Sequence, residues 1–107
     1  MKTFQKKCSV GVLASGSGTD LQSIIDASEH DMIDAKVVVV ISDKSDAGAL
    51  TRAKKHHIPG FFVNPNGKDR AAHEREIDVL LHQHQVELVV GAGYMRMLSP
   101  SFVKKLR

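Results

Sequence analysis

The sequence has 107 residues, 42% of them hydrophobic and 25% charged, which is ordinary for one globular domain. The net charge of +3 is small and scattered, so it does not predict nucleic-acid binding but leaves small anionic ligands open. No apolar run could span a bilayer, and the basic start of the chain does not lead into a signal peptide. The single cysteine, Cys8, excludes an internal disulfide and fits a cytoplasmic protein. We expect one domain over residues 1–107 with no membrane segment.

The order of elements predicts the fold. Short apolar and β-branched runs predict strands over residues 8–14, 36–41, 60–63 and 87–92. Helical spacing of apolar residues predicts helices over residues 19–30, 47–57 and 68–85, and Ser99-Pro100 predicts a last helix over residues 101–107. Because helices alternate with strands, the strands must run parallel with right-handed crossovers. The sequence therefore predicts an α/β fold, a Rossmann-like open parallel sheet with helices on both faces.

The glycine loop between the first strand and the first helix is the first chemical signal. Glycines let the backbone approach a ligand, and the start of a helix offers unpaired N–H groups that suit a phosphate. The third glycine of the dinucleotide fingerprint is replaced by Leu21, which favours a single phosphate. The candidate phosphate-binding residues are Gly16, Ser17, Gly18, Thr19 and Asp20. The alternative is a tight turn in which Thr19 or Asp20 is the N-cap.

A second loop follows the fourth predicted strand. In open α/β sheets the binding crevice lies at the carboxyl ends of the strands, where the strand order reverses, and we expect the first and fourth strands to flank it. An apolar and aromatic loop there could hold a flat heterocycle, or it could simply pack against the domain. Its residues are Gly93, Tyr94, Met95, Arg96, Met97 and Leu98.

Other polar residues give weaker signals. Arg70, near the start of the longest predicted helix, could pair with a carboxylate or could be a solvated arginine. His82 and His84 do not share a helix face, and His56 and His57 are adjacent, so we predict no metal site.

Three segments together resemble the phosphoribosylglycinamide formyltransferases, a branch of the formyltransferase family. They are VLASGSGTDLQSIID (residues 12–26), VISDKSDAGALTRAKKHHIP (residues 40–59) and LVVGAGYMRMLSPSFV (residues 88–103). The resemblance begins near Cys8 and implies the amino-terminal half of the formyltransferase fold. The last segment fits these transferases better than the related formyltetrahydrofolate deformylases.

The resemblance implies a role for each candidate residue. The glycine loop would hold the phosphate of phosphoribosylglycinamide, and Gly93 would lie near the glycinamide. The residues implied in folate binding are Arg70, Tyr94, Met95, Arg96, Met97 and Leu98. The implied reaction of purine biosynthesis moves a formyl group from the co-substrate 10-formyltetrahydrofolate to the substrate amine, without a metal.

The sequence also departs from this pattern. Asp20 stands where the family usually has asparagine, and we expect Asp20 to cap the helix and point away from the phosphate. The asparagine, histidine and aspartate that the family uses for catalysis are expected beyond Arg107, so the chain alone is predicted inactive. Two alternatives stay open, a non-catalytic phosphate-binding module and a deformylase-like hydrolase. An open sheet edge predicts a homodimer or a swapped oligomer.

Overall fold

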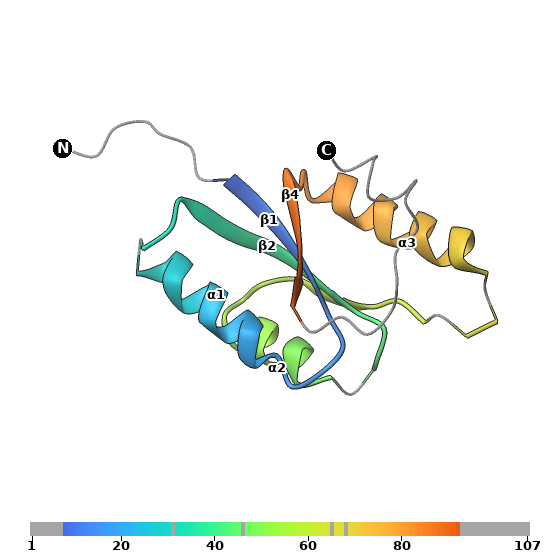
Figure 1. The fold of residues 1–107 in the computed structure, drawn as a ribbon, viewed down its shortest axis with the longest axis horizontal. Helices are drawn as coiled ribbons and strands as arrows, with labels where there is room; N and C mark the ends of the chain where they lie inside the picture. Colours follow the sequence, from blue (N-terminus) through green and yellow to red (C-terminus); the bar gives the residue numbers. More distant parts are fainter. Residues whose placement is uncertain (1–7, 31, 46, 65, 68, 93–107) are drawn as a thin grey trace.

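The computed structural model describes residues 8–30, 32–45, 47–64, 66–67 and 69–92 (Figure 1). The strands are β1 (Cys8–Ala14), β2 (Ala35–Ser42), β3 (Gly60–Phe62) and β4 (Leu88–Ala92), and the helices are α1 (Thr19–Glu29), α2 (Gly48–Lys55) and α3 (Arg70–Gln83). The predicted alternation of strands and helices is confirmed over these residues, although α3 is shorter at both ends than expected. The helix expected over residues 101–107 lies outside the described residues.

The strand order places the chain reversal beside the first strand. The four strands are parallel and lie in the order β3-β2-β1-β4. The chain therefore moves outward from β1 through β2 to β3 and then returns to the other side of β1 to form β4. The predicted α/β fold and the predicted reversal between β1 and β4 are both confirmed.

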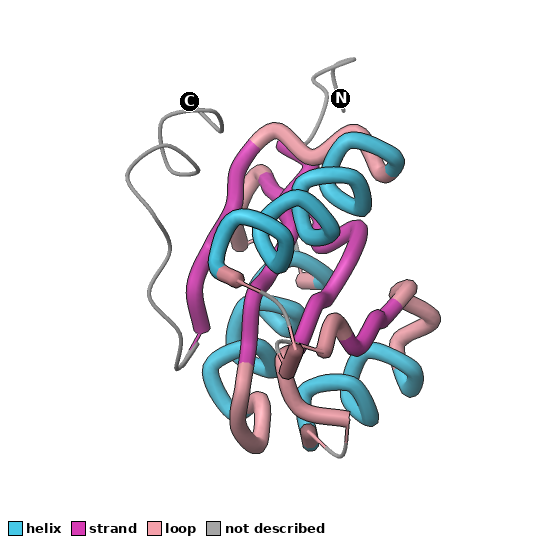
Figure 2. Tube along the Cα trace, turned by 90° about the vertical axis from the view of Figure 1, so that its right-hand side faces the viewer, coloured by secondary structure: helices cyan, strands magenta, loops and turns pink. Residues whose placement is uncertain are grey.

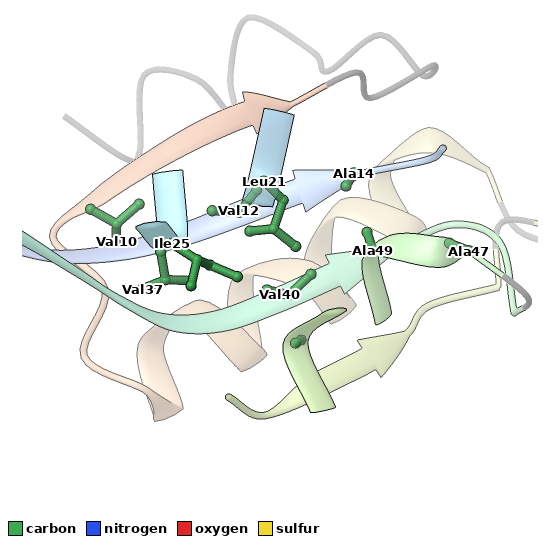
Figure 3. Close-up of a cluster of buried hydrophobic side chains, with 10 residues drawn as sticks. Val10, Val12, Ala14, Leu21, Ile25, Val37, Val40, Ala47 and Ala49 are labelled. Atoms are coloured by element: carbon green, nitrogen blue, oxygen red, sulfur yellow. The ribbon is translucent and has the colours of Figure 1, made fainter. Parts of the chain in front are cut away.

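Two layers of helices cover the sheet. Helices α1 and α2 lie on one face and α3 lies on the other (Figures 1 and 2), because right-handed crossovers on opposite sides of β1 emerge on opposite faces. The cluster under α1 and α2 consists of Val10, Val12, Ala14, Leu21, Ile25, Val37, Val40, Ala47, Ala49 and Ala53. Figure 3 shows Leu21 and Ile25 of α1 over the side chains of β1 and β2. The cluster under α3 consists of Leu13, Val39, Ile41, Val63, Ile77 and Leu81.

Burial on both faces explains why β1 and β2 are almost continuously apolar. Val12 and Leu13 point to opposite faces, and both are at most 1% exposed. A strand of this kind stays in the centre of a sheet, so the loop that follows β1 is held by the most rigid part of the fold.

The two edges of the sheet differ in length. Within the described residues, β3 has three residues and β4 has five, and Leu88 at the start of β4 is 51% exposed. An exposed edge with an apolar side chain favours pairing with another chain. The oligomer expected from the sequence stays a prediction.

Candidate functional site

The glycine loop begins where β1 ends. The residues from Val10 to Ser15 are buried, whereas Gly16 and Ser17 are exposed, so the chain reaches the surface at the carboxyl edge of the sheet. Gly18 then adopts a left-handed conformation, with φ of 85°, and α1 starts at the next residue. Glycine adopts this conformation without steric cost, which explains the abrupt turn from strand to helix.

The amino end of α1 is open. Gly18 is the N-cap residue and no side chain forms a capping hydrogen bond, so the expectation that Thr19 or Asp20 caps the helix is wrong. The first backbone bond of α1 runs from the Gln22 N–H to the Gly18 carbonyl, over 2.8 Å. The N–H groups of the preceding turn have no acceptor within the helix, and the helix dipole adds partial positive charge there. An anion fits this position.

The start of helix α2 packs against the glycine loop. The Ala49 N–H donates to the Gly16 carbonyl over 3.3 Å. A Cβ atom at Gly18 would lie 2.6 Å from the Ala49 Cα, and one at Gly48 would lie 2.5 Å from the Ser17 carbonyl oxygen. Contacts this short with backbone atoms admit only glycine at both positions, so the loop and the start of α2 are packed against each other without side chains between them. No sequence motif had indicated that Gly48 supports the loop.

A buried polar pair joins the ends of the two central strands. The Ser15 hydroxyl, which follows β1, donates to the Asp43 Oδ1 atom, which follows β2, over 2.6 Å. Ser15 is 4% exposed and Asp43 is 8% exposed. Hydrogen bonds to ionised acceptors are stronger than neutral ones, and buried polar groups are costly when unsatisfied. This pair therefore fixes the glycine loop relative to the β2–α2 turn. No motif in the sequence predicts this pair, although Asp43 lies two residues after a predicted central strand.

Two hydroxyl groups lie at the open end of α1. The Ser17 Oγ and Thr19 Oγ1 atoms are 2.8 Å apart, and both residues are exposed. Each hydroxyl has one proton to donate, so the pair can turn at least one O–H towards a bound anion. Together with the backbone N–H groups, these hydroxyls give the open end of α1 a set of hydrogen-bond donors.

The second loop starts beside the first. In the register of the sheet, Leu13 lies opposite Gly91 and Ala14 lies opposite Ala92. The chain therefore leaves β4 at the same edge of the sheet at which it leaves β1. The residues expected to surround the glycinamide and the folate, namely Gly93, Tyr94, Met95, Arg96, Met97 and Leu98, lie outside the described residues.

Arg70 is the first residue of α3 and is exposed. Asp69 is the N-cap, and its side chain accepts a hydrogen bond from the Ala72 N–H over 2.8 Å. Because α3 follows a parallel strand, it starts on the carboxyl side of the sheet, which is the side that holds the glycine loop. The arginine is thus on the expected side of the molecule, and its role in folate binding stays a proposal.

A hollow of about 430 Å³ lies elsewhere, at the amino edge of the sheet. Residues from the ends of α1 and α2 and from the start of β2 line it, and no residue of the glycine loop is among them. Among residues 8–92, outside their masked positions, no group of three or more histidine, cysteine or acidic side chains could hold a metal ion. No helix in the same part of the chain is long and apolar enough to cross a membrane.

The family model described as "Formyl transferase" matches residues 8–107, which is nearly the whole chain. The chain belongs to the formyl transferase family. The open helix end that we describe therefore lies in a fold whose relatives carry out formyl transfer chemistry.

Individual relatives agree with this assignment. The chain is 42% identical over 97 residues to phosphoribosylglycinamide formyltransferase of Haemophilus influenzae, covering 90% of this chain and 46% of that protein. It superposes on glycinamide ribonucleotide transformylase 1 of Geobacillus kaustophilus with a TM-score of 0.89 at 32% identity, covering 94% of this chain and 54% of that one. It also superposes on a formyltetrahydrofolate deformylase of Pseudomonas putida with a TM-score of 0.88 at 25% identity, covering 98% of this chain and 37% of that one. The chain thus spans about half the length of the phosphoribosylglycinamide formyltransferase that it matches.

Asp20 places a carboxylate beside the open end of α1. Its side chain is exposed in the first turn of α1 and makes no capping bond. A carboxylate there stabilises the helix through the dipole but repels a phosphate that binds at the same helix end.

We expect Asp20→Asn to raise the affinity of the loop for a phosphate monoester about tenfold, because two unit charges about 4 Å apart repel by about 1 kcal/mol in water and a phosphate carries nearly two charges. Isothermal titration at low ionic strength measures the change, and the gain should shrink as salt is added. Asp34→Asn removes an equal charge from the opposite edge of the sheet and serves as the control. An affinity that stays the same or falls in Asp20→Asn would show that the carboxylate does not face the anion.

Proposed function

We propose that the glycine loop binds the phosphate of phosphoribosylglycinamide, and that the chain is part of an enzyme that transfers a formyl group from 10-formyltetrahydrofolate to the amine of this substrate. Membership of the formyl transferase family and the names of the relatives support the reaction. The observation that carries the substrate assignment is the uncapped amino end of α1, directly after a loop whose carbonyl groups are turned towards α2.

The direction of the loop peptides explains why the site prefers an anion. The carbonyl groups of Gly16 and Ser17 accept hydrogen bonds from α2, so both point towards that helix. In a trans peptide the N–H group points opposite to the carbonyl group. The N–H groups of Ser17 and Gly18 therefore point away from α2, and with those of the first turn of α1 they form a row of donors for phosphate oxygens.

Phosphate binding at this position would orient the rest of the substrate. A ribose extending from the phosphate along the carboxyl edge would place the amine near the end of β4, where the second loop begins. We propose that Gly93 lies near the glycinamide, and that Arg70 and residues Tyr94, Met95, Arg96, Met97 and Leu98 contact the folate. Formyl transfer also needs a donor for the developing oxyanion and an acceptor for the amine proton, and we assign neither role to the glycine loop.

Titration of the chain with phosphoribosylglycinamide tests the phosphate assignment. Each hydrogen bond to a charged group contributes about 1.5–3 kcal/mol, so the same compound without its phosphate should bind at least about tenfold more weakly. The amide signals of residues 17–20 should shift with the phosphorylated compound in NMR spectra and not with the other. Equal affinities for the two compounds, or shifts confined to other residues, would contradict the assignment.

The deformylase alternative rests on the solved structure from Pseudomonas putida. A deformylase passes the formyl group to water, so it needs no phosphorylated amine. Phosphate-dependent binding at the loop therefore separates the two activities. A binding module would also bind the phosphorylated compound, but a longer protein that contains this chain would then transfer no formyl group to it from 10-formyltetrahydrofolate.

We also propose that residues 1–107 form one domain and that the enzyme is cytoplasmic. The single sheet, with β1 in contact with strands from both halves of the described chain, supports one domain. The name of a Bos taurus relative, trifunctional purine biosynthetic protein adenosine-3, and the single cysteine support the compartment.

A further inference from the structure

We propose that Arg52 is a positioning residue for the phosphate site, an inference that rests on the proposed function of the glycine loop. Arg52 belongs to α2 and is half-buried. Its Nε atom donates to the Ser17 carbonyl over 2.9 Å, and its Nη1 atom donates to the Gln22 Oε1 atom of α1 over 3.2 Å. One guanidinium group therefore joins α2, the glycine loop and α1.

The bond to the Ser17 carbonyl fixes the peptide that supplies the Gly18 N–H. The Ser17 carbonyl and the Gly18 N–H belong to one planar trans unit, so holding the carbonyl towards Arg52 holds the N–H towards the opposite side. Glycine at positions 16 and 18 leaves the loop with few restraints of its own. The other hydrogen bond from α2 to the loop in the described residues is the backbone bond from Ala49, which at 3.3 Å is long.

The charge of Arg52 adds a second effect. A guanidinium group stays ionised, and its hydrogen bond polarises the peptide that accepts it. A polarised peptide is a better N–H donor on its far side. The Gly18 N–H therefore becomes a stronger donor to an anion, although Arg52 itself lies on the other side of the loop.

The packing around Arg52 shows that its position is fixed. A Cβ atom at Gly18 would lie 3.0 Å from the Arg52 Cδ atom, so the arginine stem crosses the loop at close range. Gln22 is held in turn, because its Nε2 atom donates to the Asp26 Oδ1 atom over 2.9 Å. The His56 Nε2 atom lies 3.2 Å from the Gln22 Nε2 atom, and the His56 Nδ1 atom lies 2.8 Å from the Glu29 Oε2 atom. A chain of polar contacts between α1 and α2 thus fixes the guanidinium group.

Three variants of the full chain test the positioning role. Arg52→Met removes the donor and the charge but keeps the stem, Arg52→Lys keeps a charged donor, and Lys55→Met removes an equal charge from an exposed position of α2. Circular dichroism first establishes that each variant is folded. The measured quantities are the dissociation constant for phosphoribosylglycinamide and the amide signals of Ser17 and Gly18 without ligand.

We expect Arg52→Met to weaken the binding of phosphoribosylglycinamide about tenfold, because the Gly18 N–H would no longer be oriented towards the phosphate. One hydrogen bond to a charged group is worth at least that factor. Arg52→Lys should recover most of the affinity, and Lys55→Met should change it less than about twofold, because an exposed charge without a contact to the loop contributes little. In the ligand-free chain, the Gly18 amide signal should shift in Arg52→Met and stay in place in Lys55→Met.

The ligand-free amide signals separate this inference from the proposed function. If the original chain does not bind phosphoribosylglycinamide, the proposed function fails, and the Gly18 signal still decides whether Arg52 orients the loop. A folded Arg52→Met variant with an unchanged Gly18 signal, or with the original affinity, would overturn the positioning role.

Discussion

Replacement of Gly18 by alanine should destabilise the protein by about 3 kcal/mol and abolish phosphate binding. The left-handed conformation of Gly18 costs other residues about 1–2 kcal/mol. The added Cβ atom would lie 2.6 Å from the Ala49 Cα, so α2 must move away, which costs about 1–3 kcal/mol more. For a chain of this size the melting temperature should fall by about 15 °C. Urea unfolding and phosphate titration measure the two effects.

Gly16→Ala is the matched control for this substitution. Gly16 belongs to the same loop, but a Cβ atom there would have no neighbour within 4 Å, and the φ angle of Gly16 is not in the left-handed region. We expect the free energy of unfolding of the Gly16→Ala variant to stay within about 0.5 kcal/mol of that of the unsubstituted protein, as for other surface substitutions. If both variants lost the same stability, the loss would come from the general stiffness of the loop rather than from the packing of Gly18 against α2.

Replacement of Ser15 by alanine should cost about 2 kcal/mol, because it removes the hydroxyl that donates to the buried Asp43 carboxylate. The loop and the β2–α2 turn should then separate, and phosphate affinity should fall together with stability. Urea unfolding gives the free energy, and titration with phosphoribosylglycinamide gives the affinity.

Two further variants show whether the charge of Asp43 is the cause. Asp43→Asn keeps an oxygen that can accept from Ser15, so its cost should be smaller, and adding it to Ser15→Ala should recover part of the loss because the buried group is then neutral. Ser45→Ala removes the same hydroxyl from an exposed turn and should be neutral. A double variant less stable than Ser15→Ala alone would argue against an uncompensated carboxylate.

The elements that the sequence predicted well are those whose signal is local. The strand over residues 8–14 is correct to the residue, because an apolar run between a polar segment and a glycine turn leaves few alternatives. The short strand after Pro59 begins at Gly60 as predicted and ends one residue earlier than expected, at Phe62. The end of α3 was placed too late, because helical spacing of apolar residues does not show where the last turn of a helix frays.

In the candidate site, too, only the features with a local sequence signal were predicted. The glycine loop could be located from its residues alone, since a strand, glycines and a helix start occur in order. The N-cap could not, because Thr19 and Asp20 are ordinary capping residues and only the left-handed Gly18 shows that α1 begins without them. Asp20 was therefore expected to cap the helix, whereas its side chain makes no capping hydrogen bond.

By itself, the amino-acid sequence determined the order of strands and helices, the parallel sheet and the position of the glycine turn between β1 and α1. These features depend on periodicity, on proline and glycine, and on neighbours along the chain. Only the tertiary structure decided which residues support that turn, since Arg52, Gly48 and Asp43 reach the loop from 28 to 35 positions away in the chain. A residue that far along the chain contacts the loop only after the sheet has brought β1 and β2 together. No local sequence pattern predicts such a contact.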